Sequence, residues 1–136
     1  MSYTVLNSAM ASTLLSDPEV AGLFSADADL VAMLDFEAAL AEAEAEAGVF
    51  SSRLAQQIAA ACRGFRPDMV RLDAGISRDG MAVPDLVAQL REAIGTEASK
   101  YLHFGATSQD VIDTSLTSRL QRVNQILEPR LLNVCA

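Results

Sequence analysis

The residues best suited to chemistry lie together in the stretch His-Phe-Gly-Ala-Thr-Ser-Gln-Asp, residues 103–110. His103 is the only histidine of the sequence, and the hydroxyls of Thr107 and Ser108 follow it closely. Thr107 and Asp110 have nearly the spacing and chemistry of a capping box, which predicts that a helix begins at Thr107 or Ser108. Unpaired backbone N–H groups and the dipole at a helix start favour a carboxylate or a phosphate.

Two explanations of this stretch stay open when only its residues are considered. Gly105 lacks a side chain, so it would let the backbone approach a ligand closely. Serine and threonine also cap helices for purely structural reasons, and a single histidine in a loop often serves as a hydrogen-bonded spacer. The pattern therefore predicts either an anion site or a simple helix cap.

The first element that must support this stretch is a long helix early in the chain. Ser25 is a good capping residue, and the acidic residues Asp27 and Asp29 suit the positive end of a helix dipole. Gly48 is typical of a helix end. Apolar positions recur between them at helical spacing, namely Leu30, Leu34, Ala38, Ala41 and Ala45. We interpret the alternating acids of this helix as a solvent-exposed face rather than a functional carboxylate pair: Glu42, Glu44 and Glu46.

Two shorter helices are predicted in the middle of the chain. One begins at residue 51 or 52 and ends at Gly64, with Cys62 on its apolar side. The other runs from Pro84, which suits a first helical position, to Gly95. Because the apolar pattern weakens over 66–81, we predict a connecting segment there.

The longest predicted helix follows the chemical stretch, from about Val111 to Leu131. Pro129 predicts a kink or an end over 125–128. The apolar stripe of this helix needs more partners than the preceding residues can supply. We therefore expect a bundle that is completed by another chain or by a missing carboxyl-terminal portion.

Composition excludes several classes of protein. The chain has 136 residues, 23 of them alanine, and only 5% are aromatic, which favours an all-α fold. A net charge of −8 argues against nucleic acid and anionic membranes as partners. Two isolated cysteines, Cys62 and Cys135, with one histidine nearly exclude a zinc site. Without a basic amino-terminal region or a long apolar run, we expect a cytoplasmic protein.

The string over residues 103–114, His-Phe-Gly-Ala-Thr-Ser-Gln-Asp-Val-Ile-Asp-Thr, resembles the first signature region of the fumarase/aspartase superfamily. Within it, the chain is most similar to the 3-carboxy-cis,cis-muconate cycloisomerase family. Three stretches carry this similarity, namely residues 24–25 with 33–41, residues 79–84 with 86–87, and residues 105–110. Adenylosuccinate lyases usually carry a histidine in the segment that corresponds to 73–84, and this sequence has none there. The resemblance covers about residues 10–132.

The resemblance implies an all-α fold with an amino-terminal helical domain over 1–106 and the start of a central helical bundle over 107–136. It also implies a homotetramer, a small polycarboxylate substrate and no cofactor. The implied reaction adds a carboxylate across a double bond within 3-carboxy-cis,cis-muconate and gives 4-carboxymuconolactone. The alternatives are an adenylosuccinate lyase-like β-elimination and a non-catalytic helical fragment that only oligomerises.

The resemblance also implies roles for single residues. Thr107 and Ser108 would hold a substrate carboxylate, and His103 and Gln109 would border the same pocket. The supporting residues would be Gly105, Asp110, Asp113 and Thr114. Two nearby cations could serve a polyanionic substrate or lie in solvent: Arg78 and Lys100.

The sequence contains only the first of the family's three signature regions. We therefore expect the catalytic acid and base to be absent from this chain, which leaves the catalytic residues unassigned. The last residues, 133–136, depart from the family pattern after Leu132. We expect a truncated chain that is incomplete for catalysis.

Overall fold

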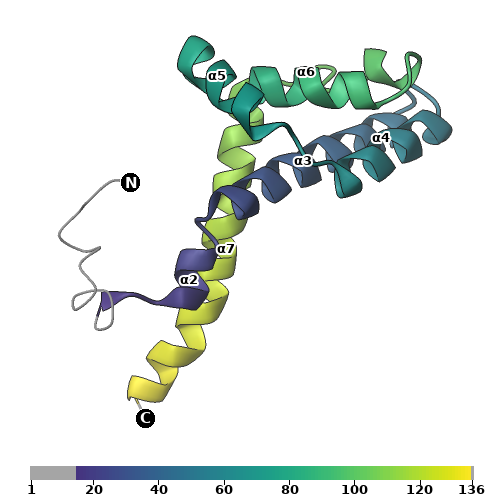
Figure 1. Cartoon of the computed structure of the whole chain (residues 1–136). Helices are drawn as coiled ribbons and strands as arrows, with labels where there is room; N and C mark the ends of the chain where they lie inside the picture. Colours follow the sequence, from purple (N-terminus) through teal and green to yellow (C-terminus); the bar gives the residue numbers. More distant parts are fainter. Residues whose placement is uncertain (1–14, 136) are drawn as a thin grey trace.

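The computed structural model describes residues 15–135, and all regular structure in that range is helical (Figure 1). The predicted all-α fold is confirmed. The part of the resemblance that precedes Leu15 and the final residue, Ala136, lie outside the described residues. The elements in order are α2 (Pro18–Gly22), α3 (Ala26–Glu46), α4 (Ser52–Gly64), α5 (Met69–Asp79), α6 (Val83–Ala93), the 3-10 turn η2 (Ala98–Lys100) and α7 (Ser108–Cys135).

Helices α3 and α4 form an antiparallel pair, α5 and α6 lie beside them, and α7 extends away as a long arm with α2 at its side (Figure 1). The start of α3 is capped as predicted, because the Ser25 hydroxyl accepts from the Ala28 N–H at 3.2 Å. Gly48 follows the helix with a φ of 79°, a conformation that favours glycine. The predictions for α3, α4 and α6 hold within a few residues.

The connecting segment predicted over 66–81 is wrong, because this segment contains α5. The Asp68 carboxylate caps the helix and accepts from the N–H groups of Val70 and Arg71 at 2.9 and 3.2 Å. Of the residues in α5, Leu72 and Gly75 alone are buried. Such a narrow buried face leaves little apolar periodicity in the sequence.

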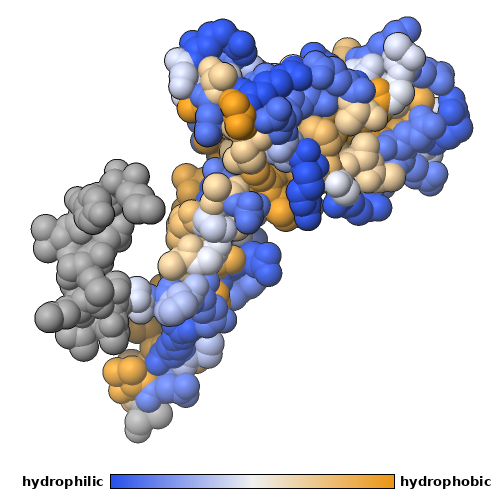
Figure 2. All heavy atoms as spheres, viewed as in Figure 1, coloured by the Kyte–Doolittle hydropathy of each residue, from blue (hydrophilic) through white to orange (hydrophobic). Residues whose placement is uncertain are grey.

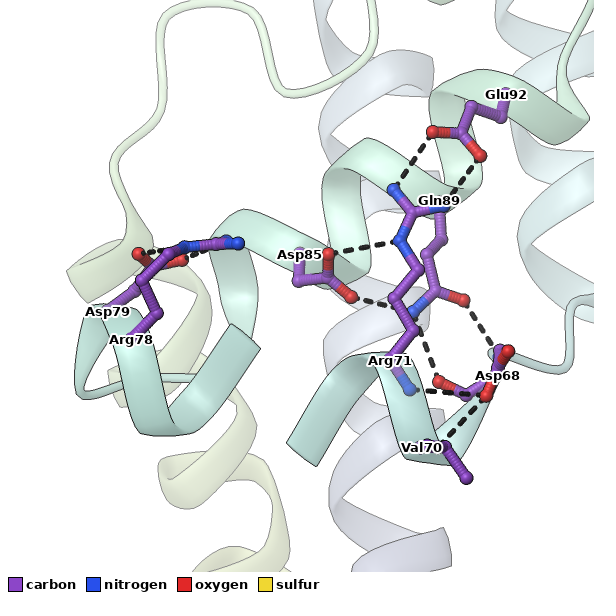
Figure 3. A network of polar contacts seen from close by, with 8 residues as sticks. All are labelled: Asp68, Val70, Arg71, Arg78, Asp79, Asp85, Gln89 and Glu92. Atoms are coloured by element: carbon purple, nitrogen blue, oxygen red, sulfur yellow. Dashed lines mark hydrogen bonds and ion pairs between the residues drawn. The ribbon is translucent and has the colours of Figure 1, made fainter. Parts of the chain in front are cut away.

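A polar network joins α5 to α6 (Figure 3). Arg71 donates to Asp85 at 3.2 Å and to both oxygens of Glu92 at 2.9 and 2.7 Å. The Gln89 amide donates to Asp85 at 2.7 Å and accepts from the Asp68 N–H at 2.7 Å. The buried Asp85 carboxylate thus has partners for both oxygens, which is what burial of a charge requires.

Gly75 lets α5 approach this network closely. A Cβ atom at position 75 would lie 2.6 Å from the Cβ of Asp85. We expect Gly75→Ala to lower the free energy of unfolding by about 1–3 kcal/mol, because α5 must move away from α6. Urea denaturation measures this. Gly64→Ala is the matched control, since nothing lies within 4 Å of its Cβ position. Equal stability of the two variants would contradict the close packing.

The hydrophobic core lies among α3, α4 and α6 and is closed by Leu102 and Val111. Cys62 is buried there, as predicted, at 2% exposure. Burial raises the pKa of the Cys62 thiol to about 12, and the nearby Glu37 carboxylate adds to the rise. The largest fully buried side chains of this core are Ile58, Leu72, Leu86, Leu90 and Leu102.

Helix α7 continues through Pro129 to Cys135, so the alternative of an end over 125–128 is wrong. Arg130, one residue after the proline, pairs with Asp17 and Glu19 at α2, and these pairs hold the last turns of α7. Nearer its start, Arg119 donates to Asp29 of α3 at 2.6 Å.

Most of α7 is exposed in the described part of the chain. Within the helix, burial is limited to Val111 and Ser115. The apolar stripe beyond them is open to solvent, and hydrophobic surface is visible on the arm in Figure 2. Its exposed members include Leu116, Leu120, Leu127 and Leu131, at 38–64%. Among the described residues, no helix is both long and apolar enough to cross a membrane.

Candidate anion-binding site at the start of α7

The loop before α7 turns through two left-handed residues. His103 has a φ of 58° and Gly105 a φ of 70°. The conformation is unfavourable for a residue with a side chain, so the surrounding structure must hold His103 in place. A Cβ at Gly105 would lie 3.7 Å from Oε1 of Glu44, so this loop lies against α3.

Helix α7 begins with the predicted capping box. The Thr107 N–H and hydroxyl donate to Oδ2 of Asp110 at 2.7 and 2.8 Å. The Asp110 N–H points back to the Thr107 hydroxyl at 3.4 Å. The bond from the Thr107 backbone, and then the one from its hydroxyl, hold the pKa of Asp110 below its usual value, with a smaller contribution from His103.

This cap separates the roles of the two hydroxyls. The Thr107 hydroxyl is used as donor and as acceptor within the cap, so it can donate to a ligand only if Asp110 releases it. Ser108, the first residue of α7, is half-buried, and its hydroxyl has no hydrogen bond within residues 15–135. The Gln109 amide donates to Asp113 at 2.6 Å. Ser108 is thus the side chain best placed to donate to an anion.

An acid that the sequence motifs did not indicate, Glu37, lies beside His103. Glu37 of α3 is 2% exposed, and its Oε1 lies 2.6 Å from Nδ1 of His103. The other oxygen, Oε2, is buried and has no hydrogen-bond partner in the described part of the chain. The sequence does indicate its burial, since Glu37 follows Leu34 by three residues and precedes Ala41 by four. It therefore lies on the buried face of the helix.

The interpretation of Glu42, Glu44 and Glu46 as one solvent-exposed face is wrong for Glu44. Glu42 and Glu46 are exposed, and Glu42 pairs with Arg63 at 3.2 Å. Glu44 is half-buried, and its Oε2 has no hydrogen-bond partner among the described residues. Burial, together with the charge of Glu37 two turns away, raises the pKa of Glu44.

We expect Glu44→Gln to stabilise the fold at neutral pH. A raised pKa means that the folded state penalises the ionised carboxylate, a cost that develops above the ordinary value of 4.5 and disappears below it. The urea midpoint of the variant should therefore exceed that of the wild type at pH 7 and match it near pH 3. Glu46→Gln is the exposed control on the same helix. A midpoint for Glu44→Gln no higher than that of Glu46→Gln at pH 7 would contradict this account.

The other predicted residues lie around this centre or away from it. Asp113 and Thr114 are exposed on α7, and Thr114 lines a groove of about 560 Å³ between α3 and α7 together with Arg119. Arg78 is exposed and donates to Asp79 at 2.8 and 2.7 Å. Lys100 is exposed. The structure brings together His103, Gly105, Thr107, Ser108 and Asp110, with Glu37 and Glu44 behind them.

Within residues 15–135, no group of three or more His, Cys, Asp or Glu side chains is arranged to hold a metal ion. What this arrangement offers chemically is a helix start with a hydroxyl donor, beside an imidazole that a buried carboxylate contacts. Such donors can hold the carboxylate of a small molecule.

The sequence pattern of the lyase family matches residues 15–135. The chain belongs to this lyase family. The resemblance to the fumarase/aspartase superfamily is therefore confirmed. The family match continues to residue 135, past Leu132, where we expected the sequence to depart from the pattern.

Relatives within the lyase family include two kinds of enzyme. The chain is 40% identical to the 3-carboxy-cis,cis-muconate cycloisomerase of Pseudomonas putida over 114 residues, which are 82% of this chain and 27% of that protein. It is 37% identical to the adenylosuccinate lyase of Methanothermobacter thermautotrophicus over 120 residues, 86% of this chain and 26% of that one. The chain thus spans about a quarter of the length of these relatives.

Solved structures agree with the lyase fold. The 3-carboxy-cis,cis-muconate lactonizing enzyme of Pseudomonas putida superimposes with a TM-score of 0.80 at 39% identity, over 86% of this chain and 27% of that one. The fumarate lyase of Mesorhizobium sp. BNC1 gives 0.81 at 36% identity, over 88% and 28%.

Proposed function

We propose that this chain supplies carboxylate-binding residues to a cycloisomerase that converts 3-carboxy-cis,cis-muconate to 4-carboxymuconolactone. The observation that carries the proposal is the half-buried Ser108 hydroxyl at the start of α7, which has no hydrogen-bond partner within residues 15–135. The similarity to cycloisomerases at 40% identity supports this choice of reaction.

The reaction explains why fixed donors would matter. A substrate carboxylate oxygen forms a C–O bond at one end of a double bond, and the π electrons move to the neighbouring carbon. They delocalise into the carboxylate attached to that carbon until an acid delivers a proton to it. Hydrogen-bond donors that are already aimed at this second carboxylate stabilise the charge as it develops. We assign this task to Ser108 and the first N–H groups of α7.

The rest of the active site is assigned to parts of the protein outside this chain. A tricarboxylate needs several cationic partners, yet Arg78, one of the two cations considered for this role, is already paired with Asp79. We propose that the proton donor and further cations come from the remainder of the lyase fold and from neighbouring subunits of a homotetramer. The exposed apolar stripe of α7 supports such an assembly.

The competing function is an adenylosuccinate lyase-like β-elimination, which the 37% identity to the archaeal enzyme favours. A graft distinguishes the two. Residues 15–135 of this chain replace the matched quarter of the Pseudomonas putida cycloisomerase and, separately, of the Methanothermobacter thermautotrophicus lyase. The cycloisomerase graft is assayed by loss of the diene absorbance of 3-carboxy-cis,cis-muconate, and the lyase graft by cleavage of adenylosuccinate.

We expect activity in the cycloisomerase graft and a loss of at least tenfold when that graft carries Ser108→Ala. A folded cycloisomerase graft without activity, beside an active lyase graft, would overturn the proposal in favour of β-elimination. Two folded but inactive grafts would favour the non-catalytic helical fragment.

A further inference from the structure

We propose that Glu37 is a positioning residue for His103. Its carboxylate accepts a hydrogen bond from Nδ1–H of the imidazole, which leaves Nε2 as the ring nitrogen that faces a ligand. The inference deepens the proposed anion site and rests on it for its functional meaning. The geometry of the pair does not depend on the identity of the substrate.

The contact between the two side chains is short and sheltered from water. Glu37 Oε1 and His103 Nδ1 are 2.6 Å apart, and the side chains are 1% and 14% exposed. In model compounds imidazole is a stronger base than a carboxylate, so a proton shared between them rests on the nitrogen. An ionised carboxylate has no proton to donate. The arrangement therefore favours Nδ1–H as the donor and Glu37 as the acceptor.

The hydrogen bond also holds the loop that contains His103 in its conformation. His103 adopts a left-handed φ of 58°, which costs free energy for a residue with a side chain. Glu37 reaches the ring from α3, 66 residues earlier in the chain, and so ties the loop to a rigid helix. Nδ1 of His103 is thereby bonded to a buried residue of α3. Within residues 15–135, no side chain or backbone group bonds Nε2.

The second carboxylate oxygen of Glu37 indicates that the pair does more than fill the core. Its Oε2 is buried without a partner among residues 15–135, a cost that a purely structural residue of similar size, such as methionine, would avoid. Retaining a carboxylate there makes sense if its charge acts on the imidazole. Second groups that orient a functional histidine by its other nitrogen are a general feature of active sites.

The tautomer of His103 can be measured directly, because the chain has a single histidine. The chain is labelled with ¹⁵N-histidine, and long-range ¹H–¹⁵N spectra are recorded at a pH where the ring is neutral. We expect the wild type to hold its proton on Nδ1. Glu37→Met, which removes the acceptor, should shift at least half of the population to Nε2–H. A wild type with its proton on Nε2, or a Glu37→Met spectrum that still shows only Nδ1–H, would overturn the proposal.

Two further variants complete the experiment. Glu42→Gln lies on the same helix but is exposed and should leave the tautomer unchanged. Glu37→Leu also removes the acceptor and is unbranched at Cβ, so it replaces Glu37→Met if that variant does not fold. It should likewise shift at least half of the population to Nε2–H, and an unchanged Nδ1–H signal would contradict the proposal.

A titration with propane-1,2,3-tricarboxylate separates this inference from the proposed function. If the wild type holds Nδ1–H but its His103 signals do not respond to the tricarboxylate, the positioning role stands and the anion site fails. If the signals respond while the wild type holds Nε2–H, the anion site stands and the positioning role fails.

Discussion

Ser108→Ala is expected to weaken the binding of propane-1,2,3-tricarboxylate by at least about tenfold. A hydrogen bond to a charged group contributes about 1.5–3 kcal/mol, and about 1.4 kcal/mol corresponds to a tenfold change in affinity. The Ser108 hydroxyl makes no bond within the described residues, so its loss leaves no internal group unpaired. Isothermal titration calorimetry at low salt measures the affinity, and urea denaturation should show an almost unchanged stability.

Two other variants of α7 serve as references for Ser108→Ala. Thr107→Ala removes the hydroxyl that caps the helix and should cost about 1 kcal/mol of stability. Ser118→Ala removes an exposed hydroxyl in the groove between α3 and α7 and should change neither quantity. If Ser118→Ala weakened binding more than Ser108→Ala did, the anion would bind in the groove.

Leu102→Ala is expected to lower the free energy of unfolding by about 2–5 kcal/mol. Leu102 is 1% exposed, closes the core and immediately precedes His103. Its carbonyl accepts from Arg91 at 3.0 Å, so the backbone cannot easily move to fill the cavity. Urea denaturation at neutral pH gives the change in stability.

The control for Leu102→Ala makes the same chemical change on the surface. Leu132 of α7 is 65% exposed, so Leu132→Ala should change stability by no more than about 0.5 kcal/mol. Equal losses in the two variants would mean that the start of α7 does not rest on the core through Leu102.

The helices that could be predicted from the sequence are those with a wide apolar face and clear ends. Helix α3 has Ser25 as its cap and Gly48 beyond its end, and both signals are local. Helix α5 was missed because only two residues supply its buried face, and Arg71 connects it to α6 through polar contacts. Polar contacts between two helices produce no periodic pattern in the sequence of either helix.

In the candidate site, too, local features could be predicted and contacts between distant residues could not. The capping box between Thr107 and Asp110 is local, and the structure contains it. The burial of Glu37 could have been inferred from its position between Leu34 and Ala41 on the apolar face of α3. Its contact with His103 could not be inferred from the sequence, because the two residues are 66 positions apart. The family, in contrast, was identifiable from the string over 103–114.

The most direct test of the central claim is a ¹H–¹⁵N titration of the ¹⁵N-labelled chain with propane-1,2,3-tricarboxylate. We expect the largest shifts at the backbone N–H groups of Ser108 and Gln109 and at the His103 ring. Shifts confined to the groove residues Thr114, Ser118 and Arg119, or no shifts at all, would contradict a carboxylate site at the start of α7.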